Sequence, residues 1–311
     1  MDDFIKKNIT IVIPTYNAEK TIYKTLDDVS KIFQKIIIVD ANSKDLTKNI
    51  CDKFAIQFFT SKKNRGLQLN IGGDKCDSDW IFFLHADSIL DSDAINEINK
   101  FISNAKNSYK AAALKLKFNQ NNIYSFLLSK IVFFRSKYLK LPYGDQGLII
   151  SKVFYTKIGG FKPLPIMEDV EIVKNIGFKN IILLDSYIIT DSIRYKDQGW
   201  LFRPLINLYC LSLYFLGFNI NLINNDINSN NDTIIQNNYQ YLVKNKLNLF
   251  LNIVYFIFLF GFILLFEYLF FQFIILKYRI ISKQELEFLI IQTYLPVLNN
   301  YISSNNINFN I

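Results

Sequence analysis

The chain has 311 residues, half of them hydrophobic and 16% aromatic, so it can bury a large core in one or two domains. Its formal net charge is +8, but no basic cluster alternates with stacking aromatic residues, which argues against nucleic acid as a partner. A basic balance beside a very apolar C-terminal third instead favours an anionic membrane surface. Cys51, Cys76 and Cys210 form neither a close pair nor a metal-binding spacing, which indicates reduced thiols in a cytoplasmic domain.

The chain contains one histidine, His85, and this limits the chemistry that it can carry out. A Ser-His-Asp or Cys-His arrangement could be built only around this residue, and a zinc site with several histidines is excluded. Acid–base catalysis would therefore depend on carboxylates. The first residues lead into a strand within ten positions, so we expect no cleavable signal peptide.

Apolar runs that end in polar residues predict a mostly parallel sheet with helices between the strands, hence an α/β fold. In chain order, the predicted strands cover 8–14, 35–40, 56–60, 79–87, 111–118, 148–151 and 179–185. The predicted helices cover 18–33, 45–54, 92–105, 165–175 and 202–218, with a further helix that begins at 64. We expect Pro14 to stop the first strand, Asn17 to cap the first helix, and Gly72-Gly73 to break the helix from 64 early.

Asp40 and Asp87 each end a predicted strand, so we expect both to face the crevice beyond the carboxyl edge of the sheet. A nucleotide diphosphate would bind there if Mg²⁺ or Mn²⁺ bridged a carboxylate and the phosphates. His85 and Asp87 lie two residues apart on an expected extended chain, which places both ligand groups on one side. The alternative is that Asp87 and Ser88 only cap the next helix.

Glu168 and Asp169 open a predicted helix, where the helix dipole stabilises negative charge. An ionised carboxylate that faces a crevice is suited to take a proton from an attacking hydroxyl group. The alternative is that these two residues serve only as a helix cap.

An apolar insertion covers 123–139 and contains several basic residues. Its composition fits two roles, because it could lie on a membrane or cover the site. The sequence does not choose between them.

The C-terminal third divides into a polar linker and an apolar tail. Residues 226–240 are rich in asparagine, and such a composition buries too little apolar surface to fold by itself. We therefore expect a globular domain over 1–225, this linker, and a membrane-associated helical tail over 241–311. Residues 249–276 are the candidate transmembrane segment, although a helical hairpin in the membrane interface fits the same composition. Basic residues flank both ends, which leaves the orientation open.

Short motifs occur along the chain in an order that is typical of one enzyme family. They are Ile11–Asn17, Val39–Asp45, Arg65–Asn70, Leu84–Asp87, Gly144–Gly147, Gly159–Phe161, Met167–Glu171 and Asp191–Arg194. Together they resemble a family 2 glycosyltransferase of the GT-A (Rossmann-like) fold over roughly residues 8–225. Three of them, at 65–70, 144–147 and 191–194, are similar to one bacterial subgroup whose substrates are mostly unassigned.

The resemblance implies a set of residues that bind the nucleotide-sugar donor. The set is Pro14, Tyr16, Asn17, Asp40, Arg65, Gln68, Asp87, Asp145, Gln146 and Arg194. Within it, Pro14, Tyr16 and Asn17 would shape the nucleotide pocket, and Asp40 would contact the base. Asp87, together with His85, would hold a divalent metal and with it the donor diphosphate.

The resemblance also implies that Asp169, beside Glu168, is the catalytic base of an inverting single displacement. The sequence departs from the family pattern at two positions. His85 replaces the first Asp of the usual DxD motif, which leaves the metal with one fewer carboxylate. Asn42 stands where glycine is common, and asparagine tolerates the same turn conformation.

The sequence thus predicts a glycosyltransferase at the cytoplasmic face of the cell membrane that moves a sugar from a nucleotide donor to an unidentified acceptor, with a lipid as one candidate. Two alternatives remain open. A nucleotidyltransferase would usually carry a glycine-rich, basic phosphate loop near the first strand, and residues 15–18 are not one. A non-catalytic membrane-anchored protein could keep the fold without the chemistry.

Overall fold

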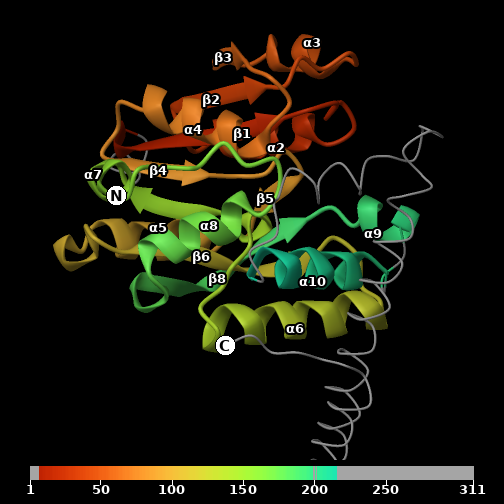
Figure 1. The fold of residues 1–311 in the computed structure, drawn as a ribbon. Helices are drawn as coiled ribbons and strands as arrows, with labels where there is room; N and C mark the ends of the chain where they lie inside the picture. Colours follow the sequence, from red (N-terminus) through yellow and green to blue (C-terminus); the bar gives the residue numbers. More distant parts are fainter. Residues whose placement is uncertain (1–6, 199, 201, 216–311) are drawn as a thin grey trace, which may run out of the picture. The chain divides into compact units, whose positions relative to one another are not determined.

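The computed structural model describes residues 7–198, 200 and 202–215 (Figure 1). In this part of the chain, one sheet has the strand order β3-β2-β1-β4-β7-β6-β8-β5. The strands are β1 (Ile9–Thr15), β2 (Lys35–Asp40), β3 (Gln57–Thr60), β4 (Trp80–Phe83), β5 (Ser88–Leu90), β6 (Ala111–Phe118), β7 (Leu148–Ser151) and β8 (Ile181–Thr190). The predicted bounds of β2, β6 and β7 are confirmed; β2 and β7 are apolar runs, and the second half of β6 alternates apolar residues with lysines.

The two halves of the sheet are paired differently. β1 is parallel to β2 and β4, and β2 is parallel to β3. β7 lies antiparallel between β4 and β6, and β5 is antiparallel to β8. The α/β fold is confirmed, but only the N-terminal half of the sheet is fully parallel. The chain re-enters the sheet at the carboxyl end of β4, where Leu148 pairs with Phe83, so β7 must run in the opposite direction.

Helices pack on both faces of the sheet (Figure 1). They are α2 (Ile22–Ser30), α3 (Thr47–Cys51), α4 (Arg65–Lys75), α5 (Ala94–Ile102), α6 (Ile123–Tyr138), α7 (Lys152–Lys157), α8 (Glu168–Ile176), α9 (Ile193–Gln198) and α10 (Phe202–Phe215). Neighbouring strand residues enter different cores: Ile11 and Phe82 pack with α2, α5 and α6, whereas Val12 and Phe83 pack with α4, α7 and α8. Both faces are therefore buried, as the apolar strands predict.

Two expectations about the first βα unit are wrong. Pro14 does not stop β1, which continues one residue further; pairing with β4 ends at Val12, so one side of β1 has no partner strand at Pro14 and the missing donor is tolerated. Asn17 does not cap the helix, because α2 begins later, with Thr21 at the N-cap. Instead Asn17 adopts a positive φ of 48° and accepts a hydrogen bond from the backbone N–H of Lys44 at 3.0 Å.

Gly72 and Gly73 lie inside α4 and do not break it, which corrects the expected early end of this helix. A Cβ atom at Gly72 would collide with the side chain of Val12, and one at Gly73 would lie 2.6 Å from the Tyr155 ring. The lost helix propensity, about 1 kcal/mol per glycine, is the cost of a close approach between α4 and the sheet.

The segment after β4 is a turn, not the expected extended chain. The backbone N–H of Ser88 donates to the carbonyl of His85 at 3.3 Å, and β5 then begins at Ser88. The alternative in which Asp87 and Ser88 cap the next helix is also wrong, because Asp93 holds the N-cap position of α5. The turn therefore presents His85 and Asp87 at the edge of the sheet.

Within the described residues, none of the helices combines the length and the apolar composition needed to span a bilayer. The predicted linker at 226–240, the tail at 241–311 and the candidate transmembrane segment at 249–276 lie outside the described residues. They stay predictions.

Candidate active site

Two hollows meet at the carboxyl edge of β1 and β4. The outer cleft, about 630 Å³, is bordered by residues that follow β1, by the start of α4 and by the turn after β4. The inner cavity, about 230 Å³, lies between the turn after β4, the start of α8 and α10. The residues that line both hollows form a shared wall: Arg65, His85, Asp87, Pro165 and Asp191.

Asp40 and Gln68 lie beneath the outer cleft and hold its floor together. Asp40 is only 3% exposed, and its carboxylate accepts hydrogen bonds from Thr15 Oγ1 at 2.7 Å and from the N–H and Oγ of Ser43 at 2.7 and 2.6 Å. Gln68 Nε2 donates to the carbonyls of Thr15 and Val39, each at 2.8 Å. Gln68 also lines the cleft, whereas the packing of Asp40 favours a role in fixing the loop.

The open side of the outer cleft carries an aromatic residue under a cation. Tyr16 is 45% exposed, and Lys63 Nζ lies 4.0 Å from the centre of its ring. Pro14 and Asn17 line the same cleft, so the three residues predicted to shape a nucleotide pocket are brought together. Sequence reasoning missed Lys63, because one lysine in a basic loop gives no local signal of the ring that it covers.

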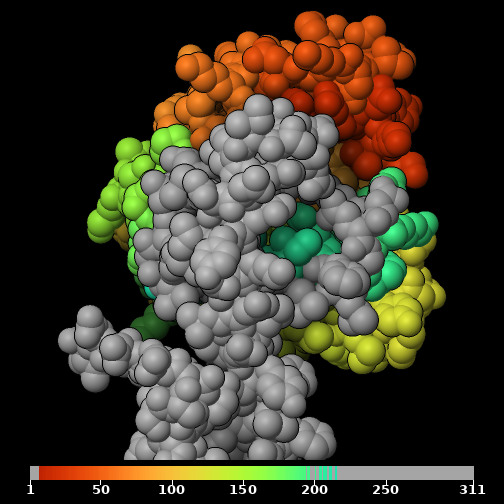
Figure 2. Space-filling view, turned by 45° about the vertical axis from the view of Figure 1, so that its right-hand side comes forward, coloured from red at the N-terminus to blue at the C-terminus, as the bar shows by residue number. Residues whose placement is uncertain are grey.

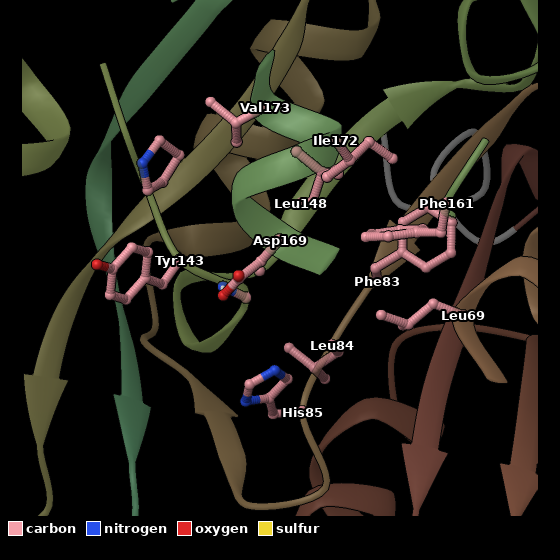
Figure 3. A pocket seen from close by; sticks show the side chains of 13 residues that line it. Leu69, Phe83, Leu84, His85, Tyr143, Leu148, Phe161, Asp169, Ile172 and Val173 are labelled. Atoms are coloured by element: carbon pink, nitrogen blue, oxygen red, sulfur yellow. Dashed lines mark hydrogen bonds between the residues drawn. The ribbon is translucent and has the colours of Figure 1, made fainter. Parts of the chain in front are cut away.

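His85 lies against the turn at Gly144–Gln146, and this contact joins two distant parts of the chain. A Cβ atom at Gly144 would lie 2.8 Å from His85 Nε2, so glycine is needed for the close approach. Figure 3 shows His85, Tyr143 and Asp169 at one end of a pocket whose other end is aromatic and aliphatic. The polar end of this pocket opens toward the inner cavity, which the same three residues also line.

Asp169 lies in the first turn of α8, and backbone donors surround its carboxylate. Oδ2 accepts from the N–H of Gly144 at 3.0 Å, and Oδ1 accepts from the N–H of Val170 at 2.8 Å. Arg65 Nη2 lies 4.0 Å from Oδ2. These donors and the helix N-terminus stabilise negative charge on a side chain that faces the inner cavity.

Glu168 is buried and paired with Arg65, whose Nε donates to Oε1. Its Oε2 has no hydrogen-bond partner among the described residues. Burial, and secondarily the charge of Asp169, raise the pKa of Glu168 to about 7, although Arg65 opposes the shift. Met167, just before this pair, adopts a positive φ of 61°. Glu168 therefore positions Arg65 on the shared wall and does not itself face the inner cavity.

Asp145 lines the inner cavity, and its Oδ1 has no hydrogen-bond partner among the described residues. Burial raises the pKa of Asp145 to about 6, with further contributions from the negative charges of Asp169 and Asp87. Arg135 of α6 opposes the shift and stacks on Tyr143, with its guanidinium carbon 3.4 Å from the ring centre. The negative charges of Asp169 and Asp87 thus add to burial in disfavouring the ionised form of Asp145.

Gln146, predicted to bind the donor, is instead a structural residue. It is fully buried, and its Oε1 accepts from Ser136 Oγ at 2.7 Å and from Arg135 Nη2 at 3.1 Å. Its Nε2 donates to the carbonyl of Leu114 at 2.9 Å. Gln146 therefore ties α6 and β6 to the loop that carries Asp145.

The last motif contributes a residue that sequence reasoning left without a role. Asp191 lies on the shared wall, and its backbone N–H donates to the carbonyl of Asp87 at 3.2 Å. Its carboxylate accepts from Asn119 Nδ2 at 3.0 Å and from the N–H of Ile193 at 2.8 Å. Arg194 lies on α9, but its side chain is outside the described part of the structure.

Of the three carboxylates expected to meet in one cleft, two do so. Asp87 and Asp169 line the inner cavity, and Asp40 lies beneath the adjoining outer cleft. A cleft at the carboxyl edge of an α/β sheet, with an acidic cavity behind it, is the place where open sheets of this class bind their ligands.

Comparison with protein families identifies the particular enzyme class. Residues 10–156 match the sequence profile of glycosyl transferase family 2, which is the family that the sequence motifs resemble. The predicted resemblance and the predicted enzyme class are confirmed, and the match speaks against the nucleotidyltransferase alternative. The matched residues include Asp87 and Asp145 but end before Asp169.

Several solved structures are distantly similar. Residues 1–349 of TarS from S. aureus are 18% identical, over 66% of this chain and 65% of that chain, with a TM-score of 0.47. Glucosyl-3-phosphoglycerate synthase from Mycobacterium tuberculosis, solved with Mn²⁺, UDP and glucosyl-3-phosphoglycerate, is 13% identical over 61% of this chain and 74% of that chain, with a TM-score of 0.44. The chain thus spans less than two thirds of the TarS fragment. No curated protein matches the sequence.

Proposed function

We propose that this protein transfers a sugar from a nucleotide-sugar donor to an acceptor hydroxyl group with inversion at the anomeric carbon. One observation carries the proposal: the outer cleft and the inner cavity meet at the shared wall, and Asp169 lines the inner cavity but not the outer cleft. In a single displacement the acceptor attacks from the face opposite the leaving diphosphate. A donor in the outer cleft and a base in the inner cavity satisfy this requirement.

The roles follow from the two sides of the wall. The nucleotide would lie by Tyr16 in the outer cleft, with its diphosphate next to Arg65 and Asp87. An acceptor hydroxyl in the inner cavity would lose its proton to Asp169 as its oxygen bonds to the anomeric carbon. The bond from that carbon to the diphosphate oxygen breaks in the same step, and the electron pair leaves with the nucleoside diphosphate.

We propose that Asp87 of the shared wall would hold a divalent metal together with the phosphates of the substrate. Among the described residues, no group of three His, Cys, Asp or Glu side chains could hold a metal ion. Mg²⁺ is commonly bound by one or two carboxylates together with substrate phosphates, which is what Asp87 beside a diphosphate would provide. Such an ion would neutralise charge on the leaving group, and His85 is the second protein ligand that we propose.

The acceptor would be amphipathic. The inner cavity presents Ile166 and Met167 beside Asn207 and Arg203, so it offers apolar and polar contacts together. A lipid-linked hydroxyl compound fits this lining, and the proposed location at the cytoplasmic face of the membrane would supply it.

Replacement of the proposed base tests the mechanism. In the full-length chain, we expect Asp169→Asn to lower the release of nucleoside diphosphate from UDP-glucose, UDP-N-acetylglucosamine or GDP-mannose about a thousandfold. Calorimetric titration with UDP, with and without Mn²⁺, should give an unchanged affinity, because the nucleotide lies on the other side of the wall.

The matched control is Asp52→Asn, which removes an exposed carboxylate that pairs with Lys48 on α3. It should change neither nucleotide release nor UDP affinity. An Asp169→Asn variant as active as the wild type would overturn the assignment of the base. A wild-type chain that binds none of the nucleotides would overturn the proposed function itself.

A further inference from the structure

Helix α6 is more apolar on its outer face than on its inner face. The inner stripe, buried against the sheet, consists of Ser125, Leu128, Val132 and Ser136. The outer stripe, at spacings of three and four residues, consists of Ile123, Leu127, Ile131, Phe134 and Tyr138, each between 51% and 64% exposed. A surface helix ordinarily shows the opposite pattern, with its apolar stripe toward the core. The outer stripe is therefore an apolar surface that needs its own explanation.

The stretch that carries α6 also holds the positive charge of the protein. Residues 98–144 contain nine Lys and Arg residues and no Asp or Glu, while the whole chain has a formal net charge of +8. The remaining residues together are therefore close to neutral. The exposed side chains of Lys130 and Lys137 border the outer stripe of α6. An apolar stripe flanked by lysines thus projects from the most basic part of the chain.

A hollow of about 710 Å³ lies beside α6, between this helix and the strands β6 and β8. Three lysines line it, Lys115 and Lys117 from β6 and Lys130 from α6. Its walls are aromatic, with Phe133 from α6 and Tyr187 from β8. Lys115 Nζ lies 5.8 and 5.5 Å from the centres of these two rings.

One acidic residue neutralises part of the positive charge of this hollow. Asp185 of β8 forms an ion pair with Lys115. Lys117 and Lys130 still provide positive charge on two sides of the hollow. A lining of lysines and aromatic rings is suited to bind a ligand that joins an anionic group to an apolar chain.

We propose that the outer face of α6 docks on a bilayer surface that contains anionic lipids. The apolar stripe would enter the boundary between headgroups and acyl chains, and the lysines would contact the headgroups. A second copy of this chain is a poor occupant, because it would bring two strongly basic stretches together. Aliphatic side chains such as Ile131 and Leu127 favour lipid over nucleic acid, which would be met by stacking aromatic residues.

The inner side of α6 connects this surface to the site. Arg135 donates through Nε to the carbonyl of Leu141 at 2.9 Å and stacks on Tyr143, a residue of the inner cavity. Docking of α6 would therefore act on the inner cavity through the contact between Arg135 and Tyr143. The docking itself does not depend on the proposed transfer reaction.

A fluorescent probe on α6 of the full-length chain tests the proposal. Phe134→Cys, labelled with an environment-sensitive dye, should brighten and shift to shorter wavelengths on vesicles of phosphatidylcholine with phosphatidylglycerol. The native cysteines, Cys51, Cys76 and Cys210, are buried and should react slowly. Val153→Cys on α7 is the matched control, because Val153 is 64% exposed against 57% for Phe134 and lies outside residues 98–144. Its emission should not change.

Replacement of two lysines tests whether the lipid headgroups must be anionic. Lys130→Gln together with Lys137→Gln should raise the lipid concentration for half-maximal response of the Phe134 probe about tenfold. Equal responses to vesicles of phosphatidylcholine alone would overturn the anionic surface. Water-like emission from the Phe134 probe in protein that sediments with vesicles would show that a surface other than α6 docks, and this would overturn the proposal. If the dye already emits at short wavelengths before vesicles are added, the outer face of α6 is covered by another part of the chain or by a second copy, and the proposal is wrong. If a DNA oligonucleotide causes a similar shift, the face binds nucleic acid, and the proposal is likewise wrong.

Discussion

The two halves of the sheet show two ways to build a site. In the N-terminal half, β1 to β4 are parallel, and the polar groups at their ends are tied to neighbouring strands, as with Asp40 and Gln68. In the C-terminal half, the strands are mixed, and Asp145 and Glu168 each keep an oxygen without a hydrogen-bond partner among the described residues. The first half thus holds the floor of the outer cleft through hydrogen bonds that are already formed. The second half instead contains Asp145 and Glu168, two buried carboxylates whose ionised form is disfavoured. This difference suggests that binding is assigned to one half and proton transfer to the other.

The largest expected effect compares two buried glutamines, one from each half. Gln146→Leu should lower the free energy of unfolding by about 4 kcal/mol, because it removes the donor to the Leu114 carbonyl and the acceptor of Arg135 Nη2 and Ser136 Oγ. Gln68→Leu should cost about 2 kcal/mol, because it releases only two carbonyls at the ends of β1 and β2. Urea denaturation of the full-length variants measures both. If Gln68→Leu proves the more costly, the larger structural role given to Gln146, which ties α6 and β6 to the loop that carries Asp145, is wrong.

A smaller effect is the pH dependence of stability, which we expect to come from the buried carboxylates of the C-terminal half. The pKa of Glu168 is about 7 in the folded protein, against 4.5 for an ordinary glutamate. Between these values the folded state keeps a proton that the unfolded chain releases, so stability falls as the pH rises through this window. We expect a loss of about 2 kcal/mol between pH 5 and pH 8.

Glu168→Gln should flatten this part of the profile, measured as the denaturation midpoint at each pH. Asp145, with a folded pKa of about 6 against 3.8, should add a slope at lower pH that Asp145→Asn removes. Identical profiles for the wild type and both variants would contradict the picture of disfavoured charge in the C-terminal half.

The smallest effect concerns the outer cleft. Lys63→Ala removes the cation that lies over the ring of Tyr16, and it should weaken UDP binding about threefold in calorimetric titration. Lys62→Ala, one residue earlier, is the control and should leave the affinity unchanged. A loss of affinity in the Lys62 variant of the same size would show that only the general charge of the loop matters.

The sequence by itself determined the local elements and the enzyme family. β2, β6 and β7 have their predicted bounds, because an apolar run between turns is a local property. The motifs around Asp87 and Asp169 also identified residues that line one cavity.

Only the tertiary structure decided which polar groups face a cavity and which hold the fold. Gly72 and Gly73 stay helical because they lie against β1 and Tyr155, and neither neighbour is visible from residues nearby in the chain. Glu168 meets Arg65 across 103 positions, and Gln146 meets Leu114 across 32. The physical reason is that burial and hydrogen-bond partners depend on contacts between distant segments, whereas strand and helix patterns depend on neighbours in the sequence.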